Sequence, residues 1–349
     1  MAVFIRLDGN ATIGSGHAMR CLSVANELQK LGVCVRFLVS DEDSRAFVAQ
    51  RGIQAEAVGG NPLRFVAEDG SRLAAAVGRG SVVLVDSYAV TPEFFEAAAA
   101  AGAKIAYLDD TYTFERGVLE QPVPYRVRMV LNYGFGFSQS QYEAVYAQTG
   151  TKLLIGPRYA LVRDLFQPLA GSFEVRSNVE RVLVTSGSTN PNGVLERMAA
   201  GCVKALPHAQ VNVVVGGAAE FDAALVPGPV VEHRNITNMA PLMTQADLVV
   251  SAAGTTLYEL CILGAPTVAV PIVDNQLINI QGFSRLQLGE VLGLGWTPDD
   301  VSHAVGKLAE SQVYRQNLHQ RMCSLVDGTG AARVAAALKS MQEAGGADA

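Results

Sequence analysis

The chain has 349 residues, a formal net charge of −6 and a hydrophobic content of 49%. This length is long for one core and natural for two domains. Because no basic stripe with interleaved aromatic residues occurs, the sequence argues against a nucleic-acid partner. The five cysteines are scattered through apolar segments without a Cys-x-x-Cys pair. This usage predicts reduced thiols and no metal centre.

The charged and apolar stretches predict that the protein neither crosses nor enters a membrane. Arg6 and Asp8 come too early for a signal peptide. The apolar stretch 251–273 is interrupted by Glu259 and Pro266. We therefore expect a cytoplasmic location and no membrane partner.

Apolar strand-like runs alternate with helix-length stretches in both halves of the chain, which predicts two mostly parallel sheets. In the first half the runs are Val3–Leu7, Val33–Val39, Val82–Val85 and Lys104–Leu108. In the second half they are Val182–Thr185, Val211–Val215, Leu248–Ser251 and Thr267–Val270.

The sequence predicts an α/β fold of two Rossmann-like domains. Residues 1–157 form the first domain and 172–349 the second, because the segment 158–171 between them has the mixed composition of a linker. Ligands of open α/β sheets bind at the carboxyl ends of the strands. We therefore expect the two domains to face a cleft that holds the ligand.

The stretch from Arg6 to His17 joins the first predicted strand to a helix over about 18–31. Its glycines permit a tight turn and close approach of a ligand, and Ser15 is the predicted helix cap. His17 opens this helix, where the dipole disfavours an imidazolium and favours a ring able to accept a proton. His17 is therefore a candidate general base. The alternative is a histidine that only satisfies the helix end.

Two loops of the second domain gather hydroxyls and backbone amides where a strand leads into a helix, as a diphosphate site requires. They are 185–190 and 251–256. Each is also compatible with an ordinary turn and a Ser/Thr cap. Glu259 follows one turn into the second helix and could bind the vicinal hydroxyls of a ribose. Alternatively, the helix dipole alone accounts for this carboxylate.

These motifs, together with segments 85–88, 108–110, 156–163 and 274–276, resemble the UDP-2,4-diacetamido-2,4,6-trideoxy-β-L-altropyranose hydrolases of pseudaminic acid biosynthesis. The resemblance spans nearly the whole chain. The stretch 251–271 is also similar to the nucleotide domain of the N-acetylglucosaminyltransferase that makes lipid II. The resemblance implies a GT-B fold.

The resemblance further implies a UDP-sugar substrate, no cofactor and no metal. His17 corresponds to the proposed base, Glu259 to the ribose-binding carboxylate, and the loop from Ile236 to Met239 to the segment that reads the uracil. The other residues assigned to substrate binding are Gly14, Ser15, Gly16, Asp86, Tyr88, Asp109, Asp110, Arg158, Tyr159, Ser186, Gly187, Ser188, Gly254, Thr255, Thr256, Asn275 and Gln276.

The implied reaction is hydrolysis at the anomeric C–O bond with inversion, in which His17 activates water. Four alternatives stay open: a GT-B glycosyltransferase, a UDP-sugar 2-epimerase that also hydrolyses, a dinucleotide oxidoreductase and a non-catalytic sugar-nucleotide sensor. The Asp-Glu-Asp run at 41–43 is similar to a metal-binding Asp-x-Asp motif. A solvated turn explains this run as well.

Overall fold

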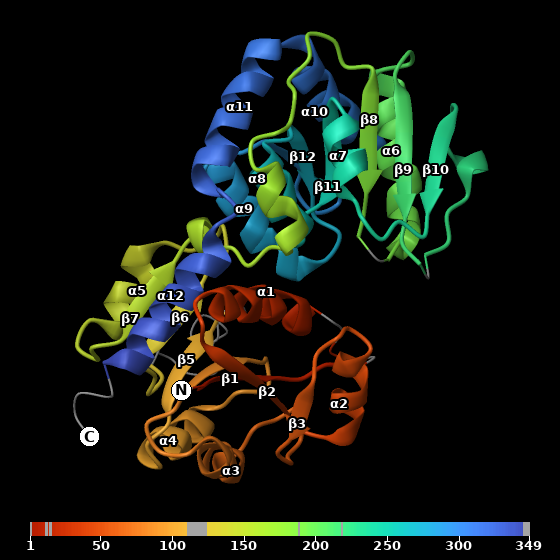
Figure 1. Ribbon diagram of the computed structural model, residues 1–349. Helices are drawn as coiled ribbons and strands as arrows, with labels where there is room; N and C mark the ends of the chain where they lie inside the picture. Colours follow the sequence, from red (N-terminus) through yellow and green to blue (C-terminus); the bar gives the residue numbers. More distant parts are fainter. Residues whose placement is uncertain are drawn as a thin grey trace. The chain divides into compact units, whose positions relative to one another are not determined.

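The structure is a computed structural model that describes residues 2–10, 13, 16–109, 124–187, 189–217 and 219–344. The chain divides into two compact units, which Figure 1 draws in colours that follow the sequence. The first unit is Met1–Arg163 with Thr329–Ala349, and the second is Asp164–Gly328. Each contains one sheet in which every pairing is parallel, so the prediction of two parallel α/β domains is confirmed.

The sheet of the first unit has the strand order β3-β2-β1-β4-β5-β6-β7. Its central strands β1 and β4 are buried on both faces, as parallel strands covered by helices are. The strands are β1 (Ala2–Leu7), β2 (Cys34–Val39), β3 (Ala55–Ala57), β4 (Val82–Asp86), β5 (Lys104–Leu108), β6 (Met129–Asn132) and β7 (Lys152–Ile155).

Two helix pairs pack within this unit, α1 on α12 and α3 on α4. Leu28 and Val24 of α1 are fully buried, which anchors the helix that carries His17. The helices are α1 (Gly16–Lys30), α2 (Glu42–Ala49), α3 (Ala67–Val77), α4 (Pro92–Ala100), α5 (Gln139–Tyr146), the 3-10 turn η1 (Pro157–Tyr159) and α12 (Gly330–Glu343).

The last helix, α12, belongs to the first unit, whereas the sequence boundary of 172–349 assigns it to the second. Figure 1 shows α12 in blue among the elements of the first unit. Polar side chains of α12 bond to first-unit carbonyls: Lys339 to Leu31 at 3.3 Å and Gln342 to Ala2 at 2.9 Å. The chain therefore leaves the first unit near residue 163 and returns at residue 329.

The sheet of the second unit has the order β10-β9-β8-β11-β12-β13. Asp247 lies at its amino edge, just before β11, and is 2% exposed. Its carboxylate accepts hydrogen bonds from Arg176 at 2.7 Å and from the backbone N–H groups of Glu180 and Arg181. The strands are β8 (Arg181–Thr185), β9 (Gln210–Val215), β10 (Val230–Arg234), β11 (Leu248–Ala252), β12 (Thr267–Val270) and β13 (Glu290–Val291).

In the second unit, α10 packs on α6 and α11 on α8. Within the described ranges, no helix combines the length and the apolarity that a membrane crossing requires. The helices are α6 (Val194–Ala205), α7 (Ala240–Gln245), α8 (Thr256–Leu263), α9 (Leu277–Arg285), α10 (Pro298–Glu310) and α11 (Gln312–Leu325), with the 3-10 turns η2 (Asp164–Leu169), η3 (Pro191–Gly193), η4 (Ala223–Leu225) and η5 (Asp274–Gln276).

Candidate functional site

Three neighbouring strands of the first sheet end in an aspartate. Asp8 follows β1, Asp86 is the last residue of β4, and Asp109 follows β5. Because β4 pairs in parallel with both β1 and β5, the three residues lie at the same edge of the sheet. Asp8, Asp86 and Asp109 are 2%, 0% and 1% exposed. Buried carboxylates are costly unless they are paired or hydrogen-bonded, so their partners define the chemistry of this edge.

His17 lies in the first turn of α1 and contacts Asp86. Its Nδ1 is 2.6 Å from Asp86 Oδ1, and the residue is 4% exposed. Because an ionised carboxylate can only accept hydrogen bonds, this contact assigns the ring proton to Nδ1. In the neutral ring Nε2 is then the acceptor, and it has no hydrogen-bond partner among the residues that the structure describes. Nε2 is therefore the atom that can take a proton from a ligand or water.

Arg20 lies one turn further along α1 and binds the same carboxylate twice. Its Nε donates to Asp86 Oδ2 at 2.6 Å, and Nη2 donates to Oδ1 at 2.5 Å. Burial alone would raise the pKa of Asp86, but the charges and hydrogen bonds of Arg20 and His17 hold that pKa below its ordinary value of 3.8. Asp86 therefore stays ionised at neutral pH and remains an acceptor for His17.

Tyr88 follows β4 by two residues and lies against His17. The two ring centroids are 4.5 Å apart, with an interplanar angle of 69°. Tyr88 is nevertheless 59% exposed, unlike the buried residues around it. An open aromatic face beside the histidine is suited to contact with the apolar face of a sugar ring.

Asp109 is part of a chain of hydrogen bonds that includes Tyr142 and Asn132. The Tyr142 hydroxyl donates to Asp109 Oδ2 at 2.9 Å and accepts from Asn132 Nδ2 at 2.6 Å. Burial and the charge of Asp109 raise the pKa of Tyr142 well above its ordinary value, so the hydroxyl keeps its proton. The sequence assigns Asp86 and Asp109 to substrate binding, but both carboxyl groups are buried and bonded to protein groups. Asp86 positions His17 and Arg20, and Asp109 positions Tyr142.

Sequence reasoning does not select Arg20, Asn132 or Tyr142. The spacing of three residues between His17 and Arg20 on one helix is a signal that could have pointed to Arg20, since such residues share a helix face. Asn132 and Tyr142 carry no comparable signal, because only the sheet topology brings them next to Asp109.

In the second unit, the first predicted phosphate loop follows β8. The Ser186 hydroxyl donates to the Thr189 carbonyl at 2.5 Å, which closes the loop on itself. Gly187 has φ = +87°, a backbone conformation that favours glycine. The hydroxyl of Ser186 is thus engaged within the loop, and its assignment to phosphate binding stays a prediction.

The second predicted phosphate loop follows β11 and leads into α8. Gly254 and Thr256 are half-buried, Thr255 is exposed, and Glu259 is 9% exposed in the first turn of the helix. Gln276 comes close to this loop, because its Nε2 lies 3.9 Å from the position of a Cβ atom on Gly254. The structure therefore brings Gln276 together with the Gly254 loop, as a shared ligand site requires.

Gln276 and Asn279 also bond to nearby backbone. Gln276 Oε1 accepts from the N–H of Ile272 at 2.9 Å, and Asn279 Nδ2 donates to the Ala253 carbonyl at 3.4 Å. Within the described part of the chain, the buried Asn279 Oδ1 has no hydrogen-bond partner. Asn275 lies in the same 3-10 turn as Gln276 and is exposed.

The remaining predicted residues belong to other segments of the chain. Ile236 and Met239 precede α7 in the second unit, where Ile236 is exposed and Met239 half-buried. Arg158 and Tyr159 lie in η1 of the first unit, where the carbonyl of Arg158 accepts a hydrogen bond from Arg333 of α12 at 2.8 Å.

Gly16 is the first residue of α1. Four of the predicted site residues fall outside the described ranges: Gly14, Ser15, Asp110 and Ser188.

The Asp41–Asp43 run begins a helix. Asp41 is the N-cap of α2, and its Oδ1 accepts from the backbone N–H of Ser44 at 2.7 Å. Helix amides and the helix dipole thus account for these carboxylates. In the ranges that the structure describes, no cluster of three or more His, Cys, Asp or Glu side chains could hold a metal ion.

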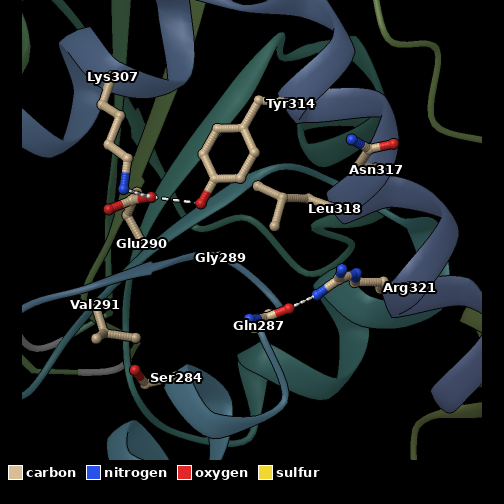
Figure 2. A pocket seen from close by; sticks show the side chains of 10 residues that line it. All are labelled: Ser284, Gln287, Gly289, Glu290, Val291, Lys307, Tyr314, Asn317, Leu318 and Arg321. Carbon is tan, nitrogen blue, oxygen red and sulfur yellow. Dashed lines mark hydrogen bonds and ion pairs between the residues drawn. The ribbon is translucent and has the colours of Figure 1, made fainter.

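A hollow of about 360 Å³ lies in the second unit. Its lining includes residues of α10, α11, β13 and the end of α9, whose side chains Figure 2 shows. Glu290 accepts from Lys307 at 2.7 Å and from the Tyr314 hydroxyl at 2.5 Å. Burial and Glu290 raise the pKa of Tyr314 to about 12. None of the predicted site residues lines this hollow, and its charged groups already have partners, since Lys307 pairs with Glu290 and Arg321 donates to Gln287.

Comparison with known proteins relates the second unit to sugar-transferring enzymes. Residues 181–324 match the glycosyltransferase family 28 C-terminal domain. Over 97% of its length, the chain is similar to the crystal structure of MurG from Acinetobacter baumannii, with a TM-score of 0.68, 16% identity and 99% of that chain covered. This likeness shows the fold alone, and with the calicheamicin glycosyltransferase CalG4 (TM-score 0.61, 16% identity, 98% of both chains) it confirms the predicted GT-B fold class.

Two curated relatives carry names from bacterial polysaccharide and sugar biosynthesis. One is the spore coat polysaccharide biosynthesis protein SpsG of Bacillus subtilis, 29% identical over 61% of this chain and 65% of its own length. The other is the pseudaminic acid cytidylyltransferase and UDP-2,4-diacetamido-2,4,6-trideoxy-β-L-altropyranose hydrolase of Helicobacter pylori, 23% identical over 91% of this chain. The chain spans 53% of the length of this second relative.

Proposed function

We propose that the protein hydrolyses a UDP-linked diacetamido-trideoxy sugar and releases UDP and the free sugar. The observation that carries this proposal is the 2.6 Å contact between His17 Nδ1 and Asp86 Oδ1, which leaves Nε2 to accept a proton. A buried carboxylate behind a histidine is an arrangement that orients a general base in hydrolases. The free sugar would serve nonulosonic acid synthesis in the cytoplasm.

The reaction needs one base and a stabilised leaving group. Water attacks the anomeric carbon on the face opposite UDP, and the bond between that carbon and the β-phosphate oxygen breaks. His17 Nε2 takes one proton of the water, the other stays on the new sugar hydroxyl, and the electron pair of the broken bond leaves with UDP. The anomeric configuration inverts. General-base assistance of this kind contributes about 100-fold to 10,000-fold.

The proposal assigns the nucleotide to loops of the second unit. Backbone amides and hydroxyls of 186–188 and 254–256 bind the diphosphate and stabilise the charge that develops on it. Glu259 binds the ribose hydroxyls, and the loop from Ile236 to Met239 reads the uracil. Asn275 and Gln276 supply neutral donors for phosphate oxygens or sugar amides.

On the sugar side, Tyr88 offers the open ring face beside His17. Arg158, Tyr159 and the segment 14–16 are the further first-unit residues that we assign to the substrate. Asp86 acts on the substrate through His17, and Asp109 acts through Tyr142. Support for the sugar itself comes from the name of the Helicobacter pylori relative, which includes the hydrolysis of such a UDP-sugar.

A glycosyltransferase is the second candidate. The match of residues 181–324 to the glycosyltransferase family 28 C-terminal domain favours a transferase. These residues belong to the second unit, to which we assign the nucleotide. The two functions share UDP release and differ in what attacks the anomeric carbon. An acceptor hydroxyl takes the place of water in the transferase.

Incubation of the purified protein with a panel of UDP-diacetamido sugars, without any acceptor, separates the two functions. We expect stoichiometric release of UDP and free sugar from at least one member, and loss of that release in His17→Asn. UDP release only after an acceptor sugar or lipid is added would support the transferase and overturn hydrolysis. Tight UDP binding with no turnover under either condition would indicate a sensor.

A further inference from the structure

The described residues around His17 include one cation that the proposed reaction does not use. Arg20 is 9% exposed, and besides Asp86 it contacts the Tyr133 hydroxyl at 3.3 Å from Nη1. It thereby links α1, the end of β4 and the residue that follows β6. Burying a guanidinium is costly because the charge loses its water. Its position at the carboxyl edge of the sheet therefore suggests a role in the site.

We propose that Arg20 is a positioning residue that fixes the plane of the Asp86 carboxylate and, through it, the tautomer and orientation of His17. This inference rests on the proposed function, in which His17 Nε2 is the base. Arg20 touches neither water nor sugar in this account. It acts on His17 through Asp86.

The geometry of the two bonds supports this role. A carboxylate held at one oxygen can rotate about its Cβ–Cγ bond, whereas Arg20 holds Oδ2 with Nε and Oδ1 with Nη2. Paired bonds of this kind fix orientation as well as charge. With the plane fixed, Oδ1 faces His17 Nδ1 at 2.6 Å and cannot turn away.

Arg20 also lies close to the ring of His17 itself. Its Nη2 lies 2.9 Å from the same Nδ1 and could donate to it if the ring proton moved to Nε2. In that tautomer Nδ1 and Asp86 Oδ1 would be two acceptors 2.6 Å apart, which is repulsive. That repulsion is absent when the proton is on Nδ1, so the contact with Asp86 favours this tautomer and leaves Nε2 as the acceptor.

Arg176 and Asp247 provide a matched pair in the second unit. Asp247 is 2% exposed and accepts from Arg176 at 2.7 Å, but this pair lies at the amino edge of its sheet. Replacing Arg176 therefore removes an arginine from a buried carboxylate without touching His17. Any loss of activity that comes from lower stability alone should appear in both variants.

The test compares Arg20→Met with Arg176→Met by imidazole ¹⁵N NMR and by steady-state kinetics with the UDP-diacetamido sugar. The protein has five histidines, and the His17 signals are assigned by their loss in His17→Asn. We expect the ligand-free wild type and Arg176→Met to show Nδ1–H for His17. Arg20→Met should show a mixture of tautomers, a kcat at least about 10-fold lower, and a UDP Kd within about 2-fold of wild type.

A pure Nδ1–H signal in Arg20→Met, or an equal loss of kcat in Arg176→Met, would overturn the inference. If Arg20→Met does not fold, Arg20→Lys replaces it, since lysine keeps the charge but not the paired bonds and should show the same mixture. The NMR result is independent of turnover. A wild type that shows Nδ1–H but hydrolyses no UDP-sugar would refute the proposed function and leave the positioning of His17 intact.

Discussion

Each unit pairs an arginine with a buried aspartate, and the two pairs lie at opposite ends of their sheets. In the first unit Asp86 and Arg20 lie at the carboxyl end of β4, beside His17. In the second unit Asp247 and Arg176 lie before β11, at the amino end. Ligands of parallel α/β sheets bind at the carboxyl ends. An arginine–aspartate pair can therefore support chemistry at the carboxyl end of a sheet and stability at the amino end.

The carboxyl ends of the two sheets differ as well. The first carries buried charged side chains bonded to one another, whereas the second carries glycines, hydroxyls and helix-start amides. Side chains with fixed protons suit proton transfer, and backbone amides suit an anion. The proposed function therefore assigns catalysis and nucleotide binding to different units, and variants should separate them.

His17→Asn should give the largest effect, a loss of turnover of roughly 100-fold to 10,000-fold with UDP affinity unchanged within a few fold. The reason is that Nε2 acts on water and the nucleotide is assigned to the other unit. His319→Asn is the control, since His319 lies in α11 of the second unit and contacts the Gly264 carbonyl and Cys323. If purified His17→Asn keeps more than about a tenth of wild-type turnover, His17 is structural.

Asp247→Ala should lower the free energy of unfolding by roughly 3 kcal/mol and leave kcat near wild type. The substitution deprives Arg176 and two backbone N–H groups of their acceptor. Denaturant unfolding and steady-state kinetics measure the two quantities. A large loss of kcat in a variant that is folded at the assay temperature would contradict the division between the two ends of the sheet.

Glu259→Ala should weaken UDP binding by roughly 1.5–3 kcal/mol, the usual range for hydrogen bonds to a charged group. Calorimetric titration of UDP gives the dissociation constant directly. Glu259→Gln serves as the comparison, because it keeps the shape and should lose less. An unchanged dissociation constant in folded Glu259→Ala would leave only the helix-dipole explanation for this carboxylate.

Treatment with EDTA should have the smallest effect, with turnover unchanged. The acidic run at 41–43 starts α2, where Asp41 already caps the helix. Assay of the chelated and dialysed protein checks this. Loss of activity that Mg²⁺ or Mn²⁺ restores would revive the metal-binding interpretation of this run, and alanine variants of Asp41 and Asp43 would then be needed.

The sequence predicts eight of the strands because buried parallel strands are continuous apolar runs. Among the described residues it misses five: the edge strand β10, whose last residues Glu232, His233 and Arg234 are polar, the short strands β3 and β13, and the four-residue strands β6 and β7. The sequence also misplaces α12, since helix periodicity carries no information about which unit a helix packs against. His17 and Asp86 are predictable from motifs, whereas their direct bond follows only from the fold.

The central claim is that His17 directs water onto the anomeric carbon, and hydrolysis in ¹⁸O-water tests it most directly. We predict that mass spectrometry will find the heavy oxygen on the sugar and none on UDP. NMR recorded before mutarotation should show the inverted anomer. Label on UDP would mean that the P–O bond breaks and would contradict the account. Label on a sugar with retained configuration would contradict direct attack by water and indicate a covalent intermediate.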